Sequence, residues 1–449
     1  MLFGYNDLIA NVGMFGRLND MSKRNLTEEL LEFIEQSPSA FHVIENMKAE
    51  LRDAGYQELA EAVPWSLEPD GKYYVVRNDS SMIAWQMPPM EDTSAYRGYH
   101  IVAAHSDSPA FLIKEHPEIC TEQAYIKLNT EKYGGMILST WLDRPLSVAG
   151  RVLVEQDGQL VSRLVNVDRD LLVIPSLAIH MDRKLNQGYE YNAQRDMLPI
   201  YADQTGKGSF AEVVAEAAGI SEADQILAQE LYLYVREFGR ILGHEGEWIL
   251  SPRLDDLQCV FGLVQSMKQS HPGRYINVTA VFHNEEVGST TRQGADSTFL
   301  EDVLLWISEA VGESFGQYRR KLSQSFLISA DNAHALHPNH PEKADPTNRP
   351  VLNGGIVLKY HGGQKYTTDA VTAAQIKLLC EEAGVPYQVY HNRSDVAGGS
   401  TLGNISAAHV SVPAADIGLP QLAMHSAVET AGSRDVRYLI ALLKQFYQQ

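Results

Sequence analysis

The second half of the chain alternates strand-like and helix-like segments, and this alternation restricts its fold more than any other feature. Each segment is recognised by its apolar period, which is continuous in buried strands and close to 3.6 residues in helices. The strand-like segments are 276–282 and 326–329, and the helix-like segments are 257–267, 299–311, 370–383 and 436–446. Strands that alternate with helices form a mostly parallel sheet with helices on both faces. We therefore predict an α/β fold for residues 246–449.

The first part of the chain adds strands to the same sheet and then changes character. Residues 73–85 and 99–104 are strand-like, and the second run is almost entirely apolar, as in a buried strand. Residues 111–245 instead contain many short β-like stretches that are broken by glycines and polar turns. We predict one α/β domain made of residues 1–110 and 246–449, in which 1–20 are an extension, and an inserted β-rich domain of residues 111–245.

The acidic composition excludes several classes of partner. The chain of 449 residues has 37 Lys and Arg against 57 Asp and Glu, a formal net charge of −20. Sequence-independent binding to nucleic acid or anionic lipid needs clustered cations, and no apolar run reaches the roughly 18 residues of a membrane span. Three widely spaced cysteines favour a reducing compartment. We expect a cytoplasmic protein that binds neither nucleic acid nor membranes.

The candidate functional residues lie where predicted strands end. Three such segments follow strands directly: His105 to Asp107, His283 to Glu286, and Ala330 to Asn332. Ligands of open α/β sheets bind outside the carboxyl ends of the strands, so these segments should converge. Asp255, at the start of a predicted helix, and His425, after a turn-rich stretch, are further candidates.

Histidines and carboxylates from separate segments suit a site for two metal ions. Zinc binds imidazole nitrogen and carboxylate oxygen. Two ions about 3.5–4 Å apart need a bridging carboxylate, and a further carboxylate must stay free to take a proton from the attacking water. The adjacent Glu285 and Glu286 can meet both needs, because consecutive side chains on an irregular turn can point to different partners. Asp107 can accept the second ring proton of His105 or of another ligand, which fixes that tautomer.

Simpler interpretations exist for several of these residues. A single His or Asp at a strand end is often a turn residue or a satisfied core group, and pairs of Glu are common on solvated faces. His334, His337 and His340 have the i, i+3 spacing of a helical metal cluster, but two prolines among them break any helix. We interpret these three histidines as loop residues.

Six short motifs, taken together and in order, resemble those of the M18 family of metallopeptidases, the aspartyl aminopeptidases. The motifs are Ser37-Pro-Ser-Ala-Phe-His42, His105-Ser-Asp-Ser-Pro109, Ser251-Pro-Arg-Leu-Asp-Asp256, Asn284-Glu-Glu-Val-Gly288, Ala330-Asp-Asn-Ala-His-Ala335 and Met424-His-Ser426. The resemblance covers almost all of the chain from about Leu30. It implies a mixed, mostly parallel sheet of the zinc-peptidase type, an inserted β-rich dimerisation domain, and assembly of dimers into a dodecamer.

The resemblance also implies a role for each candidate residue. The metal ligands would be His105 and Asp331 at one ion, Glu286 and His425 at the other, and Asp255 between them. Glu285 would be the general base, and Asp107 would be the carboxylate that supports it.

Three further positions match residues that contact substrate in the family. His180, which ends the segment Ile174-Pro-Ser-Leu-Ala-Ile-His180, would enter the active site of a neighbouring subunit. Lys359 and Tyr366 would contact the substrate side chain and the tetrahedral oxyanion. Without the resemblance, an isolated Lys in the strand-like segment 355–360 is more typical of a solvated strand edge.

We therefore expect a dinuclear, metal-dependent aminopeptidase, with zinc, manganese or cobalt at its two sites and peptides as substrates. The net charge repels acidic peptides at long range, but salt screens this repulsion within about 8 Å. Lys359 would act at contact, so we expect a preference for N-terminal Asp and Glu. The alternatives are an aminopeptidase for neutral residues, a deacylase or carboxypeptidase on a similar fold, and an inactive oligomeric scaffold, against which the retention of every candidate ligand argues.

Overall fold

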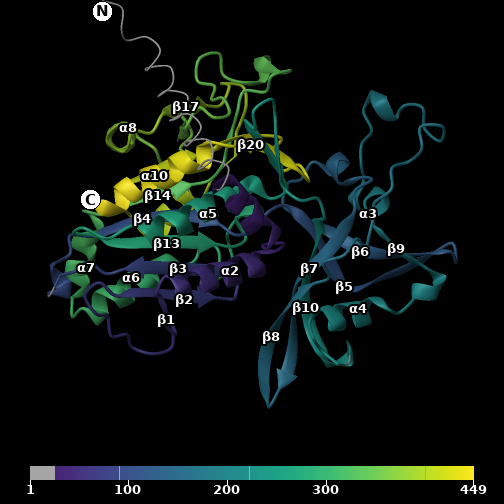
Figure 1. The fold of residues 1–449 in the computed structure, drawn as a ribbon, viewed down its shortest axis with the longest axis horizontal. Coiled ribbons are helices and arrows are strands. Elements are labelled where there is room, and N and C mark those ends of the chain that lie inside the picture. Colours follow the sequence, from purple (N-terminus) through teal and green to yellow (C-terminus); the bar gives the residue numbers. More distant parts are fainter. Residues whose placement is uncertain (1–25, 91, 222, 400) are drawn as a thin grey trace, which may run out of the picture.

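The chain forms two lobes that lie side by side along the long axis of the molecule (Figure 1). The computed structural model describes residues 26–449 except 91, 222 and 400, so the expected extension at 1–20 lies outside the described residues. Within the described residues, no helix combines the length and the hydropathy needed to span a bilayer.

A nine-stranded sheet forms the centre of the larger lobe. Its strands, in spatial order, are β1 (Gln57–Glu58), β2 (Lys72–Arg77), β3 (Ser81–Gln86), β13 (Ile276–Phe282), β4 (Tyr99–His105), β14 (Phe326–Ala330), β18 (Ala414–Gly418), β16 (Ile356–Tyr360) and β17 (Tyr387–His391). The central strands β13, β4, β14 and β18 are mutually parallel, whereas β3 and β16 join them antiparallel. The predicted mixed, mostly parallel sheet is confirmed, and the carboxyl ends of the central strands lie along one edge.

Helices cover both faces of this sheet, as predicted. One face carries the helix at residues 26–35, α2 (Ala40–Asp53), α5 (Leu254–Gln269), α8 (Ala370–Ala383) and α10 (Asp435–Gln448), and the other carries α6 (Phe299–Ala310), α7 (Phe315–Leu322) and α9 (Leu402–His409). Successive residues of a strand point to opposite faces. In β4, Ile101 and Ala103 therefore join the core under α6, while Val102 and Ala104 join the core under α5.

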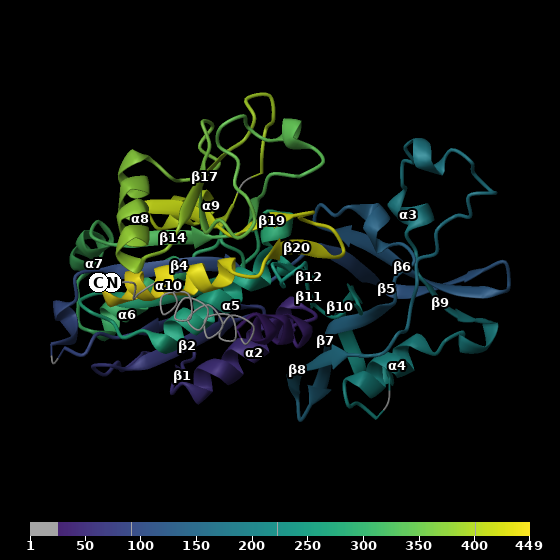
Figure 2. The same ribbon diagram turned by 45° about the horizontal axis from the view of Figure 1, so that its top comes forward.

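The smaller lobe is built on a six-stranded antiparallel sheet. Its strands, in spatial order, are β8 (Gln159–Asn166), β7 (Leu146–Gln156), β10 (Ile226–Val235), β5 (Ala110–Thr121), β6 (Tyr125–Tyr133) and β9 (Ile200–Asp203), accompanied by α3 (Ala193–Asp196) and α4 (Phe210–Ala217). Figure 2 shows this sheet at the end of the larger lobe where β12 and β20 lie. The lobe has its own apolar core, which includes Phe111 and Trp141. The division of the chain at residues 110 and 245 stays a prediction.

A third sheet lies next to the nine-stranded one, and its strands are too short to show in the sequence pattern. It consists of β11 (Arg240–Leu242), β12 (Trp248–Ser251), β20 (Glu429–Gly432), β19 (Pro420–Leu422) and β15 (Ala333–His334). Strands β19 and β20 are antiparallel neighbours, and the turn between them carries His425.

The expectation of a single strand at 73–85 is wrong. The segment is a hairpin of β2 and β3, which pair antiparallel from Lys72 with Gln86 to Arg77 with Ser81. Asn78 and Asp79 at its tip have φ values of 57° and 52°. Asn and Asp adopt this left-handed conformation more readily than most residues, which allows the tight reversal.

Candidate metal centre

The carboxyl ends of three adjacent strands bring the candidate residues together. His105 ends β4, Asp331 directly follows β14, and the short 3₁₀ turn η6 (Glu285–Val287) follows β13. Asp255 lies in the first turn of α5 and His425 in the β19–β20 turn. The side chains form overlapping groups whose nitrogen and oxygen atoms lie within 4.8 Å of one another: His105 with Asp255, Asp256 and Asp331; His105 with Glu285 and Glu286; and Asp255 with Glu286 and His425.

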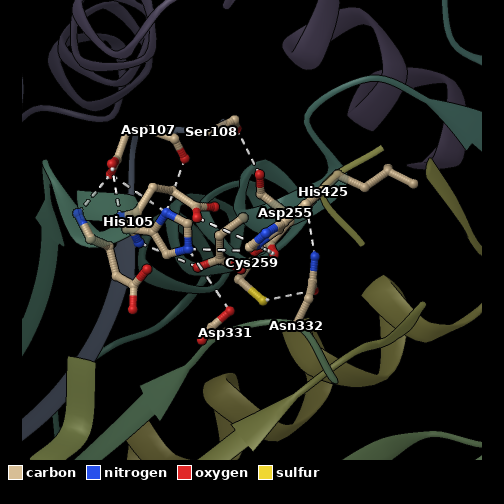
Figure 3. Close-up of polar contacts among 12 residues, drawn as sticks. His105, Asp107, Ser108, Asp255, Cys259, Asp331, Asn332 and His425 are labelled. Carbon is tan, nitrogen blue, oxygen red and sulfur yellow. Dashed lines mark hydrogen bonds and ion pairs between the residues drawn. The ribbon is translucent and has the colours of Figure 1, made fainter. Parts of the chain in front are cut away.

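Asp255 lies between the two histidines and presents a different oxygen to each. Its Oδ1 is 3.4 Å from His105 Nε2, and its Oδ2 is 3.6 Å from His425 Nε2. Figure 3 shows the side chains of His105, Asp255 and His425 converging in this order. One carboxylate that faces two imidazole nitrogens through separate oxygens has the geometry of a ligand that bridges two cations.

Each histidine also faces a second carboxylate. His105 Nε2 lies 3.8 Å from Asp331 Oδ1, and His425 Nε2 lies 3.4 Å from Glu286 Oε2. Tetrahedral ligands about 2.0–2.2 Å from a zinc ion are about 3.3–3.6 Å apart. Three of the four separations lie in this range, and the one between His105 and Asp331, 3.8 Å, is slightly longer.

Both histidine rings are held in the tautomer that a metal ion requires. His105 Nδ1 donates to the main-chain oxygen of Asp107 at 3.0 Å, and His425 Nδ1 donates to the main-chain oxygen of Gly135 at 2.8 Å. A neutral ring that donates from Nδ1 has its lone pair on Nε2, where a metal ion binds. The Nε2 atoms of both rings face Asp255.

The electrostatics of the cluster also fit bound cations. Asp255 Oδ1 and Glu286 Oε1 are buried and have no hydrogen-bond partner among the described residues. Burial, together with the charge of Asp255, raises the pKa of Glu286 well above its usual range. Buried carboxylates of this kind need a compensating positive charge. A donor set of imidazole nitrogen and carboxylate oxygen suits divalent ions such as zinc, manganese and cobalt.

Glu285 and Glu286 point to different partners, as their position on a turn predicts. Both glutamates group with His105, but only Glu286 also groups with Asp255 and His425. Burial raises the pKa of Glu285 to about 8, and the charges of Asp331 and Asp107 act in the same direction. Glu285 is thus a carboxyl group beside the predicted ligands that has a raised proton affinity.

Asp107 fixes the turn that carries both glutamates. Its Oδ1 accepts a hydrogen bond from the main-chain nitrogen of Glu285 at 3.2 Å, and its Oδ2 accepts one from the main-chain nitrogen of Glu286 at 3.2 Å. The ring proton of His105 goes to the main-chain oxygen of Asp107, while the nearer carboxylate oxygen is 3.6 Å from Nδ1. The carboxylate therefore acts mainly on the turn.

Sequence reasoning missed Glu429, which supports two of the predicted ligands. Its two carboxylate oxygens accept hydrogen bonds from the main-chain nitrogens of Asp255 at 3.0 Å and His425 at 2.7 Å. Burial, reinforced by the charge of Asp255, raises the pKa of Glu429 to about 8. Glu429 lies on β20 of the unpredicted third sheet, and no motif distinguishes it from other glutamates.

Lys359 and Tyr366 lie beside the cluster, and the solvated-edge interpretation of Lys359 is wrong. Lys359 lies on β16, inside the nine-stranded sheet, and is only 1% exposed. Its Nζ donates to the main-chain oxygens of Asp331 at 2.9 Å and Asn332 at 3.1 Å. The same nitrogen is 3.5 Å from Asp331 Oδ2 and 5.2 Å from the centre of the Tyr366 ring.

The remaining candidate histidines do not belong to the groups of predicted metal ligands. His180 lies in an exposed loop of the smaller lobe, before α3, and this loop extends away from the nine-stranded sheet (Figures 1 and 2). His337 and His340 are exposed loop residues, as interpreted. His334, however, belongs to the two-residue strand β15, because it pairs with Gln421 of β19.

Comparisons with known proteins agree over nearly the whole chain. The family model described as "Aminopeptidase I zinc metalloprotease (M18)" matches residues 33–447. A relative from Clostridium novyi (strain NT), "Probable M18 family aminopeptidase 2", is 44% identical over 432 residues, which are 95% of this chain and 99% of the relative. A relative of the same description from Clostridium acetobutylicum is 44% identical over 426 residues, 94% of this chain and 98% of its own.

Solved structures show the same arrangement of elements. The chain in the "Cryo-EM structure of the Ape4 and Nbr1 complex" has a TM-score of 0.92 and 33% identity, and the match covers 96% of this chain and 86% of that one. The chain in the "Structure of S. cerevesiae mApe1 dodecamer" has a TM-score of 0.81 and 26% identity, and the match covers 94% and 96%. The similarity therefore includes both lobes.

Proposed function

The chain belongs to the M18 family of zinc metallopeptidases, and from this premise we propose that it is a dinuclear aminopeptidase that removes acidic N-terminal residues from peptides. Family membership makes it an aminopeptidase and a metallo-hydrolase that acts on peptides. The observation that carries the dinuclear part is Asp255, whose two oxygens face the Nε2 atoms of His105 and His425.

The residues around Asp255 would hold two divalent ions, most suitably zinc. His105 and Asp331 would complete one site, and His425 and Glu286 the other. When bound, such ions supply Lewis acidity, which polarises the scissile carbonyl and lowers the pKa of a water molecule. Manganese and cobalt accept the same donor set, so metal reloading has to include all three.

Glu285 would act as the general base. Its carboxylate would take a proton from the attacking water and pass it to the leaving amine. The hydrogen bonds from the main-chain nitrogens of Glu285 and Glu286 to Asp107 would hold the base and the neighbouring ligand in register. Asp107 thus supports the base through the backbone.

Lys359 would select acidic side chains. Two of its three N–H groups are engaged by the main-chain oxygens of Asp331 and Asn332. The carboxylate oxygen of Asp331 lies 3.5 Å away, longer than a normal charged hydrogen bond. The third N–H would bind a substrate carboxylate, and Tyr366 would contact the tetrahedral oxyanion.

We further propose that the chain forms dimers that assemble into a dodecamer, in which His180 reaches the active site of a neighbouring subunit. The loop around His180 supports this, because Leu177, Ile179 and Met181 are exposed, Met181 to 76%. Clustered exposed apolar side chains mark interaction surfaces. A structural relative with a TM-score of 0.81 is described as a dodecamer.

A cytoplasmic location stays a prediction, which the free thiols of Cys120, Cys259 and Cys380 support.

The test of this function separates the two adjacent glutamates. Glu285→Gln should keep the metal content of the wild type and lose turnover by about two orders of magnitude or more, the usual scale of general-base catalysis. Glu286→Gln, the matched variant one residue away, should lose metal. Metal analysis alongside turnover of aminoacyl p-nitroanilides, after reloading with zinc, manganese or cobalt, measures both. The reverse pattern would exchange the two roles.

The same assay distinguishes the rival hydrolases. An aminopeptidase needs a free N-terminal amine, so N-blocked substrates should not be cleaved. Cleavage of blocked substrates at a similar rate would favour a deacylase, and release of C-terminal residues would favour a carboxypeptidase.

A further inference from the structure

The end of β6 connects the smaller lobe to the metal centre of the same chain. β6 belongs to the antiparallel sheet of that lobe, but its last residue, Tyr133, and the next two, Gly134 and Gly135, lie against residues of the cluster. We infer that the segment Tyr133–Gly135 positions the metal ligands, so that the smaller lobe completes the centre of its own subunit. This inference rests on the proposed function and adds positioning residues to it.

Tyr133 bonds to the carboxylate that holds the Glu285–Glu286 turn. Its hydroxyl donates to Asp107 Oδ2 at 2.7 Å, the oxygen that also accepts from the main-chain nitrogen of Glu286. The same hydroxyl accepts a hydrogen bond from Asn284 Nδ2 at 2.9 Å. Tyr133 therefore uses both its donor and its acceptor on groups next to the base and the ligand.

The Asn284 amide is itself fixed in one orientation. Its Oδ1 accepts hydrogen bonds from Thr291 Oγ1 at 2.7 Å and Gln293 Nε2 at 2.9 Å, so its amino group must face Tyr133. The hydrogen bonds thus run in one direction, from Asn284 to Tyr133 to Asp107. Removal of the tyrosine hydroxyl would leave Asn284 without an acceptor and Asp107 without its shortest hydrogen bond.

The two glycines contact the other side of the centre. The main-chain oxygen of Gly135 accepts the Nδ1 proton of His425 and so fixes the tautomer of this predicted ligand. Gly134 has a φ of +79°, and a Cβ at this position would be 3.2 Å from Glu286 Cβ. The backbone passes so close to Glu286 that a side chain at 134 would displace either the ligand or the segment.

A purely structural role is the alternative, since these contacts also hold the two lobes together. The two roles differ in what they change. Loss of a structural contact lowers the unfolding temperature and leaves metal affinity and turnover of the folded protein intact. Loss of a group that orients metal ligands typically costs about 10–100-fold in metal affinity or activity.

The first test removes one hydroxyl from each of two tyrosines of the smaller lobe. Tyr133→Phe should weaken metal binding about 10-fold or more, measured by chelator competition, and should lower kcat more than it raises KM at saturating metal. Tyr234→Phe is the control, because the Tyr234 hydroxyl donates to Asn166 Oδ1 at 2.8 Å, within the same lobe. Its metal affinity and kinetics should match the wild type.

The second test uses two glycines with the same backbone conformation. Gly158, in the β7–β8 turn, has a φ of +78°, and a Cβ there would meet nothing within 4 Å. Gly158→Ala and Gly134→Ala therefore carry the same backbone strain, but only Gly134→Ala presses on Glu286. With cobalt as the probe, Gly134→Ala should weaken binding and change the visible absorption spectrum, whereas Gly158→Ala should do neither.

The outcomes keep this inference separate from the proposed function. If the wild type binds metal and cleaves free peptides, but Tyr133→Phe and Gly134→Ala behave like their controls in affinity, spectrum and kcat, the segment is structural only and the inference is overturned. If the wild type itself binds no divalent metal, the proposed function fails first. Weakened binding in Tyr133→Phe and Gly134→Ala, with both controls unchanged, supports the inference.

Discussion

Buried His100 should lower the stability of the fold in mild acid. The residue lies near the start of β4, with its ring stacked between Tyr275 at 3.9 Å and Phe446 at 4.3 Å. Burial lowers its pKa from 6.5 to about 3, although a hydrogen bond to the backbone of Phe446 acts in the opposite direction. Glu382 and Gln449 line the groove beside it. The folded state therefore keeps this ring neutral at pH values where the unfolded state protonates it.

The sign and the size of the effect follow from this difference in pKa. Because the folded-state pKa is depressed, its contribution to stability is complete above pH 6.5 and is lost as the pH falls toward 3. At pH 5 the unfolded histidine is about 1.5 units below its pKa, and each unit corresponds to about 1.4 kcal/mol. His100 should therefore cost the protein about 2 kcal/mol of unfolding free energy between pH 7.5 and pH 5.

Urea unfolding of the wild type and of His100→Phe at both pH values measures this cost. Phenylalanine keeps the stack but does not titrate, so the variant should lose about 2 kcal/mol less than the wild type on acidification. His105 is five residues further along β4, at roughly 3.3 Å per residue, so protonation of the metal ligands should affect both proteins alike. His271→Gln, at an exposed position, should behave like the wild type. Equal acid losses in wild type and His100→Phe would refute the reasoning.

Two further predictions concern specificity and assembly. Lys359→Met removes the cation that would bind the acidic side chain. It should therefore lower the ratio of kcat/KM for Asp over Leu p-nitroanilides about 30-fold, or roughly 2 kcal/mol. Equal losses on both substrates would mean that the contacts of Lys359 with Asp331 are its whole role. His180→Ala should lower turnover without changing metal occupancy. Mixing this variant with Glu285→Gln protein should partly restore activity where subunits exchange. A fully active monomer in sedimentation would contradict this prediction.

The large elements were predictable because their own sequence determines them. β13 and α8 begin and end at the predicted residues, 276–282 and 370–383. β4 and β14 are fully or almost fully buried strands whose apolar runs leave little ambiguity. The convergence of His105, Glu286 and Asp331 then follows from the parallel order of these strands. Asp255 and His425 needed the family resemblance for their roles.

The third sheet and the supporting residues were not predictable for a physical reason. Strands of two or three residues, such as β15 and β19, have no period that a sequence can display. Glu429 supports Asp255 across 174 positions of the chain, and Tyr133 gains its role only when the two lobes meet. Lys359 on a buried strand would be unfavourable by itself. The carbonyl oxygens of Asp331 and Asn332 and the carboxylate of Asp331, which stabilise its charge, directly follow another strand, β14.

The position of the smaller lobe in the chain explains why it contacts the metal centre. The chain leaves the nine-stranded sheet at His105 and enters β5 at Ala110. It returns through β12, which ends at Ser251, only four residues before Asp255. The first connection is short, and the second runs from the end of β10 at Val235 through β11 and β12. Each starts or ends at a predicted ligand, so the lobe is anchored beside the centre. From this position it supplies Tyr133 and Gly135 to the centre of its own subunit.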